Sequence, residues 1–132
     1  MHDSEQTKTT RLHTVLLVDD DERVSRTLTI LLRLSKEWEV VGTAKDETSA
    51  LAMAAALCPD LILLDLWLPK GNSLGLIPYL RALYPTPLVV ILTADPAESL
   101  REQALAMGVD GYLDKTMGPD RLLSELHALF GD

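Results

Sequence analysis

The sequence predicts an α/β fold in which one parallel sheet of five strands carries helices on both faces. Short apolar runs alternate with longer amphipathic or alanine-rich runs along most of the 132 residues, which is typical of repeated βαβ units. The composition, 47% hydrophobic and 24% charged residues, is that of a globular chain with one substantial core. Right-handed crossovers would place the carboxyl ends of all the strands at one edge of this sheet.

The predicted strands are short apolar runs flanked by polar or turn-forming residues. The run 61–64 is apolar at every position, which favours a strand that is buried on both faces. Asp65 follows it directly, and a charge at the end of a buried strand is costly unless another group compensates it. The predicted strands span residues 14–18, 38–44, 61–64, 88–92 and 111–113.

Helical spacing of apolar residues follows each strand. Asp46 and Asp95 suit N-cap positions, because their side-chain oxygens can accept hydrogen bonds from the first free backbone N–H groups. Pro78 would lose a hydrogen bond and clash inside a helix, so the third helix is predicted to begin near Ile77 and residues 70–76 to form an irregular loop. The predicted helices span residues 22–35, 46–58, 77–84, 95–107 and 118–130.

The bulk properties exclude several classes of protein. A net charge of −8 argues against direct nucleic-acid binding, which needs a cationic surface. The single cysteine, Cys58, allows no intrachain disulfide and suits a reducing compartment. No apolar run approaches the roughly 20 residues of a membrane span, and the N-terminus lacks the apolar core of a signal peptide. We therefore expect a cytoplasmic protein with a flexible tail at residues 1–11 and one domain at 12–132.

Polar residues follow four of the predicted strands and should meet at one edge of the sheet. Taken singly, each has an ordinary explanation: an aspartate can cap a helix or a turn, a threonine is common in strands, and a lysine is usually solvated. Taken together at the edge where open parallel sheets bind ligands, they indicate a functional site. The residues are Asp19, Asp20, Asp21, Asp65, Thr93 and Lys115.

This set of side chains suits phosphoryl transfer with Mg²⁺. Neighbouring carboxylates repel one another, and a hard divalent cation that prefers oxygen ligands relieves the repulsion. Asp65 could then attack a phosphoryl group as a carboxylate nucleophile. Lys115 and the metal would keep Asp65 ionised and offset charge on the transferred oxygens, to which the Thr93 hydroxyl could donate.

The segments "LLVDDD", "LILLDLWLP", "VVILTA" and "GYLDK" together resemble the receiver domain of bacterial two-component response regulators, from about residue 12 to 130. The resemblance implies a flavodoxin-like fold with strand order 2-1-3-4-5. It implies that Asp65 accepts phosphate from a histidine kinase or phosphotransfer protein. It also implies Mg²⁺, with Mn²⁺ as a substitute, held by Asp19, Asp20, Asp65 and the backbone carbonyl of Trp67.

The resemblance assigns further roles around the acceptor. Thr93, Ala94 and Lys115 would stabilise the phosphoryl group, and Thr93 with Tyr112 would form a switch in which the tyrosine ring turns inward on phosphorylation. That switch would alter the face made by the fourth helix, fifth strand and fifth helix, where an output domain or docking protein binds. A homodimer is compatible with this scheme.

Several positions depart from the pattern of the family. Asn72-Ser73 stands where the family often has Asp-Gly, and Thr116 follows Lys115 where proline is frequent, so we expect a trans bond there because a non-proline cis bond is costly. Trp67 is either a surface aromatic or a shield that keeps water from the phosphoryl group. Asp95 either caps its helix, which we favour, or influences dephosphorylation.

Two other functions are weighed against a phosphorylated receiver. "LLVDDD" also fits a haloacid dehalogenase-like phosphatase with Asp19 as nucleophile and Asp21 as acid/base, but this leaves Asp65 unexplained and lacks a later acidic metal pair. A pseudo-receiver, which is a binding module with the same fold and no phosphorylation, is kept open by the altered loops.

Overall fold

The computed structural model describes residues 12–94 and 98–130, and in them five parallel strands form one sheet. The predicted tail at 1–11 and the predicted cap Asp95 lie outside the described residues. The strand order, β2-β1-β3-β6-β7, confirms the predicted order 2-1-3-4-5. The strands are β1 (His13–Val18), β2 (Trp38–Ala44), β3 (Leu61–Asp65), β6 (Leu88–Thr93) and β7 (Gly111–Asp114).

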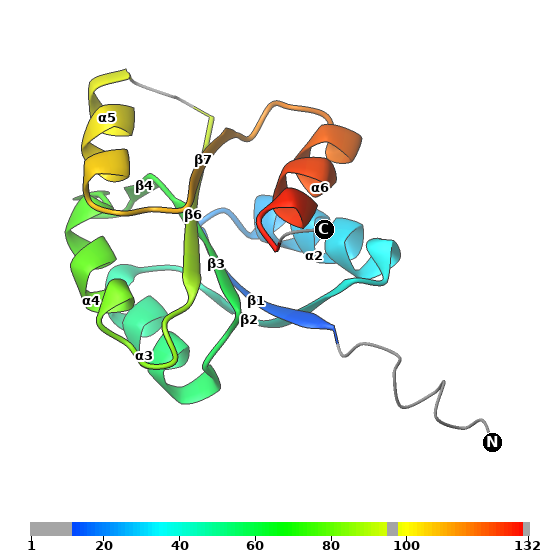
Figure 1. Ribbon diagram of the computed structural model, residues 1–132, viewed down its shortest axis with the longest axis horizontal. Coiled ribbons are helices and arrows are strands. Elements are labelled where there is room, and N and C mark those ends of the chain that lie inside the picture. The colour runs from blue at the N-terminus through cyan, green and yellow to red at the C-terminus, as the bar shows by residue number, and fades with distance from the viewer. Residues whose placement is uncertain (1–11, 95–97, 131–132) are drawn as a thin grey trace.

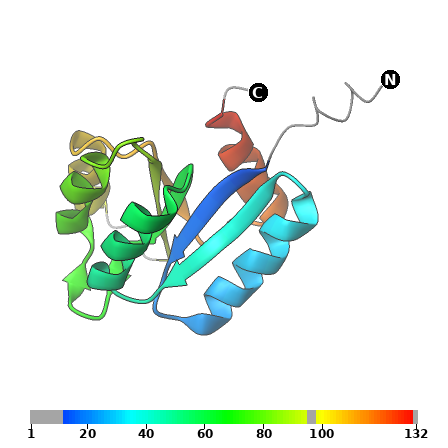
Figure 2. The same cartoon turned by 90° about the horizontal axis from the view of Figure 1, so that it is seen from below.

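Helices cover both faces of this sheet, as the alternation of the sequence predicts. One face carries α2 (Glu22–Ser35) and α6 (Pro119–Ala128), and the other carries α3 (Glu47–Leu57), α4 (Ile77–Arg81) and α5 (Glu98–Ala106) (Figures 1 and 2). Among the described residues, no helix is long and apolar enough to cross a membrane.

Local sequence signals explain where these helices begin. The Asp46 side chain accepts a hydrogen bond from the backbone N–H of Ser49 and caps α3, as predicted, while Asp21 caps α2 through the N–H of Arg23. Pro119 occupies the first turn of α6, where a missing N–H costs nothing. The α-helix α4 begins at Ile77 as predicted but ends at Arg81, well before residue 84.

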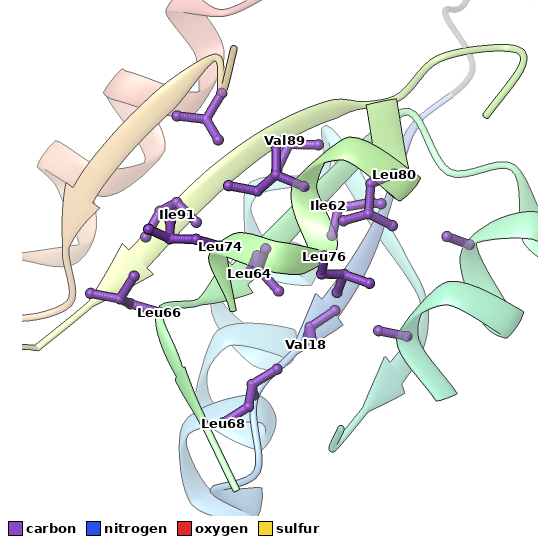
Figure 3. Close-up of a cluster of buried hydrophobic side chains, with 14 of the residues drawn as sticks. Val18, Ile62, Leu64, Leu66, Leu68, Leu74, Leu76, Leu80, Val89 and Ile91 are labelled. Atoms are coloured by element: carbon purple, nitrogen blue, oxygen red, sulfur yellow. The ribbon is translucent and has the colours of Figure 1, made fainter. Parts of the chain in front are cut away.

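The strands bury alternate side chains on the two faces. Ile62 and Leu64 of β3 pack beneath α3, α4 and α5, whereas Leu61 and Leu63 pack beneath α2 and α6. Figure 3 shows the first of these clusters, where Val18, Leu64 and Ile91 from three strands meet side chains of α4 and of the segment before it. All five residues of β3 are buried, which confirms the prediction of a strand covered on both faces.

The segment after β3 is more ordered than the irregular loop that Pro78 suggested for residues 70–76. β4 (Trp67–Leu68) pairs antiparallel with β5 (Gly71–Asn72), and a 3₁₀ turn, η1 (Leu74–Leu76), leads into α4. Gly71 has φ +131°, a conformation that favours glycine, and so permits the tight reversal between the two short strands. The segment therefore folds back upon the end of β3.

Candidate functional site

The carboxyl ends of the strands bring the predicted polar residues together, as their positions in the sequence suggest. Asp19 follows β1, Asp65 ends β3, Thr93 ends β6 and Lys115 follows β7. The side chains are largely withdrawn from solvent: Asp19 is 5% exposed, Asp65 8% and Thr93 1%. β1 and β3 flank the point where the strand order reverses, which is the usual position of a binding site in such sheets.

A cluster of three carboxylates lies at the centre of this edge. Asp19, Asp20 and Asp65 each offer an oxygen, and these atoms lie within 4.8 Å of one another, with Asp20 exposed. At 4.8 Å, two carboxylate charges repel by about 3.5 kcal/mol for an effective dielectric near 20. A hard divalent cation would relieve this repulsion and match the all-oxygen donor set, so the residues present fit Mg²⁺ or Mn²⁺.

Lys115 closes the site from the side of β7. Its Nζ lies 2.6 Å from Asp19 Oδ2 and 3.3 Å from Asp65 Oδ2. Its backbone N–H donates to the Thr93 carbonyl over 2.8 Å, which ties the lysine to the end of β6. Among the described residues, the cis peptide bond is Tyr84–Pro85, so the bond after Lys115 is trans as predicted.

The turn after β7 directs this lysine. Asp114 Oδ1 accepts hydrogen bonds from the backbone N–H and the hydroxyl of Thr116, at 2.8 Å and 2.7 Å. These two bonds lower the pKa of Asp114, because they favour its ionised form. Asp114 thus caps this turn, and its two bonds hold the chain on either side of Lys115.

The pKa values of Asp65 and Lys115 are both raised, which disfavours the charged form of Asp65 and favours the charged form of Lys115. Burial, followed by the negative charge of Asp19, raises the pKa of Asp65, and the ion pair with Lys115 opposes this rise without cancelling it. Burial by itself would lower the pKa of Lys115, but its hydrogen bond to Asp19 and the charges of Asp65 and Asp19 raise it. Lys115 alone therefore does not offset the cost of ionising Asp65, which agrees with the expectation that a metal ion shares this role.

Asp19 is held in place by its backbone and by both carboxylate oxygens. Its backbone N–H donates to the Ala44 carbonyl over 2.9 Å, joining the end of β1 to the end of β2. Asp19 Oδ1 accepts from the N–H of Asp21 at 2.9 Å, and Oδ2 accepts from Lys115. Both oxygens of Asp19 are thus engaged by close chain donors, whereas the contacts to the Asp65 oxygens are longer, 3.3 Å from Lys115 and 3.4 Å from the Trp67 N–H.

Thr93 ends β6, Ala94 follows it directly, and Tyr112 lies on the neighbouring strand β7. Ala94 is exposed directly after the buried Thr93. The Tyr112 ring is half-buried and packs against the cluster beneath α3, α4 and α5.

Trp67 lies two residues after the acceptor candidate and is 43% exposed. Its backbone N–H donates to Asp65 Oδ1 over 3.4 Å, the long limit of a hydrogen bond. Trp67 is thus a surface aromatic whose backbone adjoins the Asp65 carboxylate. These observations are compatible with both alternatives for its side chain, a surface aromatic and a shield against water.

Two residues have roles that sequence reasoning missed: Ser73 beside the site, and Asp110 at the amino end of β7. The Ser73 hydroxyl donates to the backbone carbonyl of Asp65 over 2.7 Å, and the only signal for it was the departure from an Asp-Gly pair. The Asp110 carboxylate accepts from the backbone N–H of Val89 and from Arg81, at 2.8 Å and 2.9 Å. Only the tertiary structure reveals these contacts, because the partners are far apart in the sequence.

A doubly wound parallel sheet whose carboxyl edge gathers carboxylates, a threonine and a lysine is the architecture of a phosphorylation-regulated signalling domain. The chain belongs to the response regulator receiver domain family, whose model matches residues 15–127. It is a receiver domain of the two-component type, for which phosphorylation and control of an output are typical.

Relatives and solved structures agree with this assignment. The chain is 36% identical over 114 residues to the nitrate/nitrite response regulator NarL of Escherichia coli, covering 86% of this chain and 53% of NarL. It is equally similar to the transcriptional regulatory protein KdpE of Mycobacterium tuberculosis, 36% over 114 residues and 49% of that protein. The chain thus spans about half the length of these relatives.

The structural match is close along the whole domain. The receiver domain of a NarL-type regulator from Mycobacterium tuberculosis has a TM-score of 0.82 at 27% identity, covering 93% of this chain and 100% of that one. The BeF3-activated receiver domain of RstA from Klebsiella pneumoniae also has a TM-score of 0.82, at 28% identity, with 91% and 100% covered. Both support the flavodoxin-like topology.

Proposed function

We propose that Asp65 is the phosphoacceptor of this receiver domain and takes its phosphoryl group from a histidine of a kinase or phosphotransfer protein. The observation that carries the proposal is the position of the Asp65 carboxylate at the sheet edge, between Asp19 and Lys115 and only 8% exposed. In the step, an Asp65 oxygen forms a bond to phosphorus while the phosphorus–nitrogen bond of the donor breaks, and the donor nitrogen keeps the electron pair and takes a proton from solvent.

The residues around Asp65 have distinct parts in this step. Asp19, Asp20 and Asp65 would hold Mg²⁺, with Mn²⁺ as a substitute, and the Trp67 carbonyl would complete the protein ligands. When bound, the metal supplies positive charge to the transferred oxygens. Lys115 adds a second positive charge from the side of β7, and the Thr93 hydroxyl and Ala94 backbone would donate hydrogen bonds to the same oxygens.

The signal would leave the site through Thr93 and Tyr112. We infer a switch in which the threonine hydroxyl moves to the phosphate and the tyrosine ring turns inward, altering the face of α5, β7 and α6. That face would dock an output domain or protein, or a second copy in a homodimer. Trp67 would slow hydrolysis by limiting access of water, whereas Asp95, outside the described residues, is assigned the helix cap.

The proposal makes the chain a signalling protein rather than a turnover enzyme. We place the receiver domain at residues 12–132 behind a tail at 1–11, in the cytoplasm, with no direct nucleic-acid or membrane partner. The net charge of −8 and the single cysteine support this placement. The family assignment leaves no support for the phosphatase alternative, in which Asp19 is the nucleophile.

Incubation with acetyl phosphate and Mg²⁺, followed by intact-mass measurement, tests the proposal. The wild type should gain the mass of one phosphoryl group, and the gain should disappear with EDTA and in Asp65→Asn, which keeps the shape of the side chain. Asp19→Asn should slow the reaction without moving the modified residue in a peptide map. No added mass under any condition would favour a pseudo-receiver, and modification of Asp19 would return the phosphatase alternative.

A further inference from the structure

Ser73 is a fully buried polar residue that makes two short hydrogen bonds to the segment carrying the phosphoacceptor candidate. Its hydroxyl donates to the Asp65 carbonyl and its backbone N–H donates to the Leu66 carbonyl, each over 2.7 Å. The exposed fraction of Ser73 is 0%. One residue therefore satisfies two consecutive carbonyls, beginning with that of Asp65 itself.

The surrounding chain has little freedom to move Ser73. The hairpin of β4 and β5 brings residue 73 back over residue 65, and the Ser73 carbonyl accepts from Leu76 at 3.0 Å to start the 3₁₀ turn. On either side of this link, Leu66 and Leu74 are buried in the same apolar cluster, which Figure 3 shows together with Ile91. The serine is thus anchored on both sides by packing.

Backbone geometry explains why a serine can stand at this position. Ser73 has φ −92°, which any L-residue can adopt, whereas the positive φ of +131° falls on Gly71. Asn72 adds a local bond, because its side-chain oxygen accepts from the N–H of Leu74 at 3.0 Å. The Asn72-Ser73 pair therefore replaces Asp-Gly without strain and introduces a hydroxyl that glycine lacks.

We propose that Ser73 is a positioning residue for the phosphoacceptor, acting through the backbone of Asp65. The hydroxyl fixes the peptide plane between Asp65 and Leu66, and that plane sets both the origin of the Asp65 side chain and the path of the chain to Trp67. If this plane rotates, the Asp65 carboxylate and the Trp67 carbonyl move relative to Asp19 and Asp20. This inference rests on the proposed function for the identity of Asp65 as acceptor and metal ligand.

Ser73→Ala tests the proposal because it removes the hydroxyl and leaves the rest of the segment in place. Ser35→Ala is the matched control, since the Ser35 hydroxyl also donates to a backbone carbonyl, that of Leu32 at 2.6 Å, but at the end of α2 away from the site. Mg²⁺ affinity of the unphosphorylated proteins is measured by calorimetry. The rate of phosphorylation by acetyl phosphate is measured at saturating Mg²⁺, with circular dichroism confirming that each variant is folded.

We expect Ser73→Ala to bind Mg²⁺ about tenfold more weakly, which is the size of loss found when groups that orient metal ligands are removed. We also expect it to be phosphorylated more slowly, even at saturating Mg²⁺. Ser35→Ala should match the wild type in both. Wild-type Mg²⁺ affinity and rate in Ser73→Ala would overturn the proposal, as would an equal loss in Ser35→Ala. If Ser73→Ala does not fold, Ser73→Cys keeps the size with a weaker donor and should give intermediate values, with wild-type values overturning the proposal.

The two measurements separate this inference from the proposed function. If the wild type binds Mg²⁺ but gains no phosphoryl group, the phosphoacceptor function fails, while the comparison of Mg²⁺ affinities still decides the role of Ser73. If the wild type is phosphorylated and Ser73→Ala behaves identically, the function stands and the positioning role is refuted.

Discussion

Replacing Lys115 by methionine tests how charge is balanced in the site, because Lys115 contacts both buried carboxylates. Its Nζ lies 2.6 Å from Asp19 and 3.3 Å from Asp65. Methionine has a similar length without the charge. We expect the metal-free Lys115→Met protein to lose about 3–5 kcal/mol of unfolding free energy at pH 7, the cost of breaking a buried ion pair by removing one partner.

The distances in the structure set the scale of this loss. At an effective dielectric near 20, the attractions amount to about 6 kcal/mol at 2.6 Å and about 5 kcal/mol at 3.3 Å. The ammonium itself costs several kcal/mol to desolvate, so the net loss is well below the sum of the attractions. In the variant, the repulsion between Asp19 and Asp65 remains without a cation beside it.

The loss should depend on pH, with a sign that Asp65 determines. The pKa of Asp65 is already raised by burial and by Asp19, and removing Lys115 raises it further. A carboxyl with a raised pKa penalises the folded state only where it must ionise, so the destabilisation is smallest in acid and grows as pH rises through the pKa of Asp65. The raised pKa of Lys115 means that its own contribution is complete below its ordinary pKa and is lost only in alkali.

Urea unfolding followed by circular dichroism, in EDTA and at several pH values, measures this effect. Lys45→Met is the control, since both partners of the Lys45–Glu22 pair are exposed and such solvated pairs add little to stability. Saturating Mg²⁺ should recover much of the loss in Lys115→Met by taking the place of the ammonium. Equal stability of the two variants at pH 7, or a loss that is largest in acid, would refute this reasoning.

Three further predictions follow from the same geometry. Trp67→Ala should shorten the lifetime of the phosphorylated protein several-fold, measured by intact mass after acetyl phosphate is removed, and an unchanged lifetime would discard the shielding role. Mg²⁺ affinity, followed by the fluorescence of Trp67 with Trp67→Phe as control, should fall as pH is lowered through the raised pKa of Asp65, and a flat profile would contradict the involvement of that carboxylate. Asp110→Ala should lower the free energy of unfolding by about 1–3 kcal/mol, because it leaves the buried N–H of Val89 without its acceptor. Arg81→Met should lower it less, because Asp110 still accepts that N–H. Thermal unfolding that ranks the two variants in reverse would contradict this assignment.

Local patterns in the sequence were sufficient to determine the elements and the edge at which the site lies. The apolar run before Asp65 predicted a strand buried on both faces, since no alternation with polar residues was present. Asp46 predicted the start of α3, because an N-cap depends only on residues within one turn. The alternation of strands and helices then placed Asp19, Asp65, Thr93 and Lys115 at one edge, as right-handed crossovers require.

Tertiary structure alone decided which of these residues contact one another and how their pKa values shift. Lys115 meets Asp19 across 96 residues of sequence and Arg81 meets Asp110 across 29, so neither pair has a local signal. The β4–β5 hairpin brings Ser73 back to the Asp65 carbonyl, and it depends on packing of this segment against the core. Pro78 and the glycines before it predicted only an irregular loop there. The pKa of Asp65 rises because burial and Asp19 outweigh Lys115, and that balance is a matter of distances, which only the folded chain establishes.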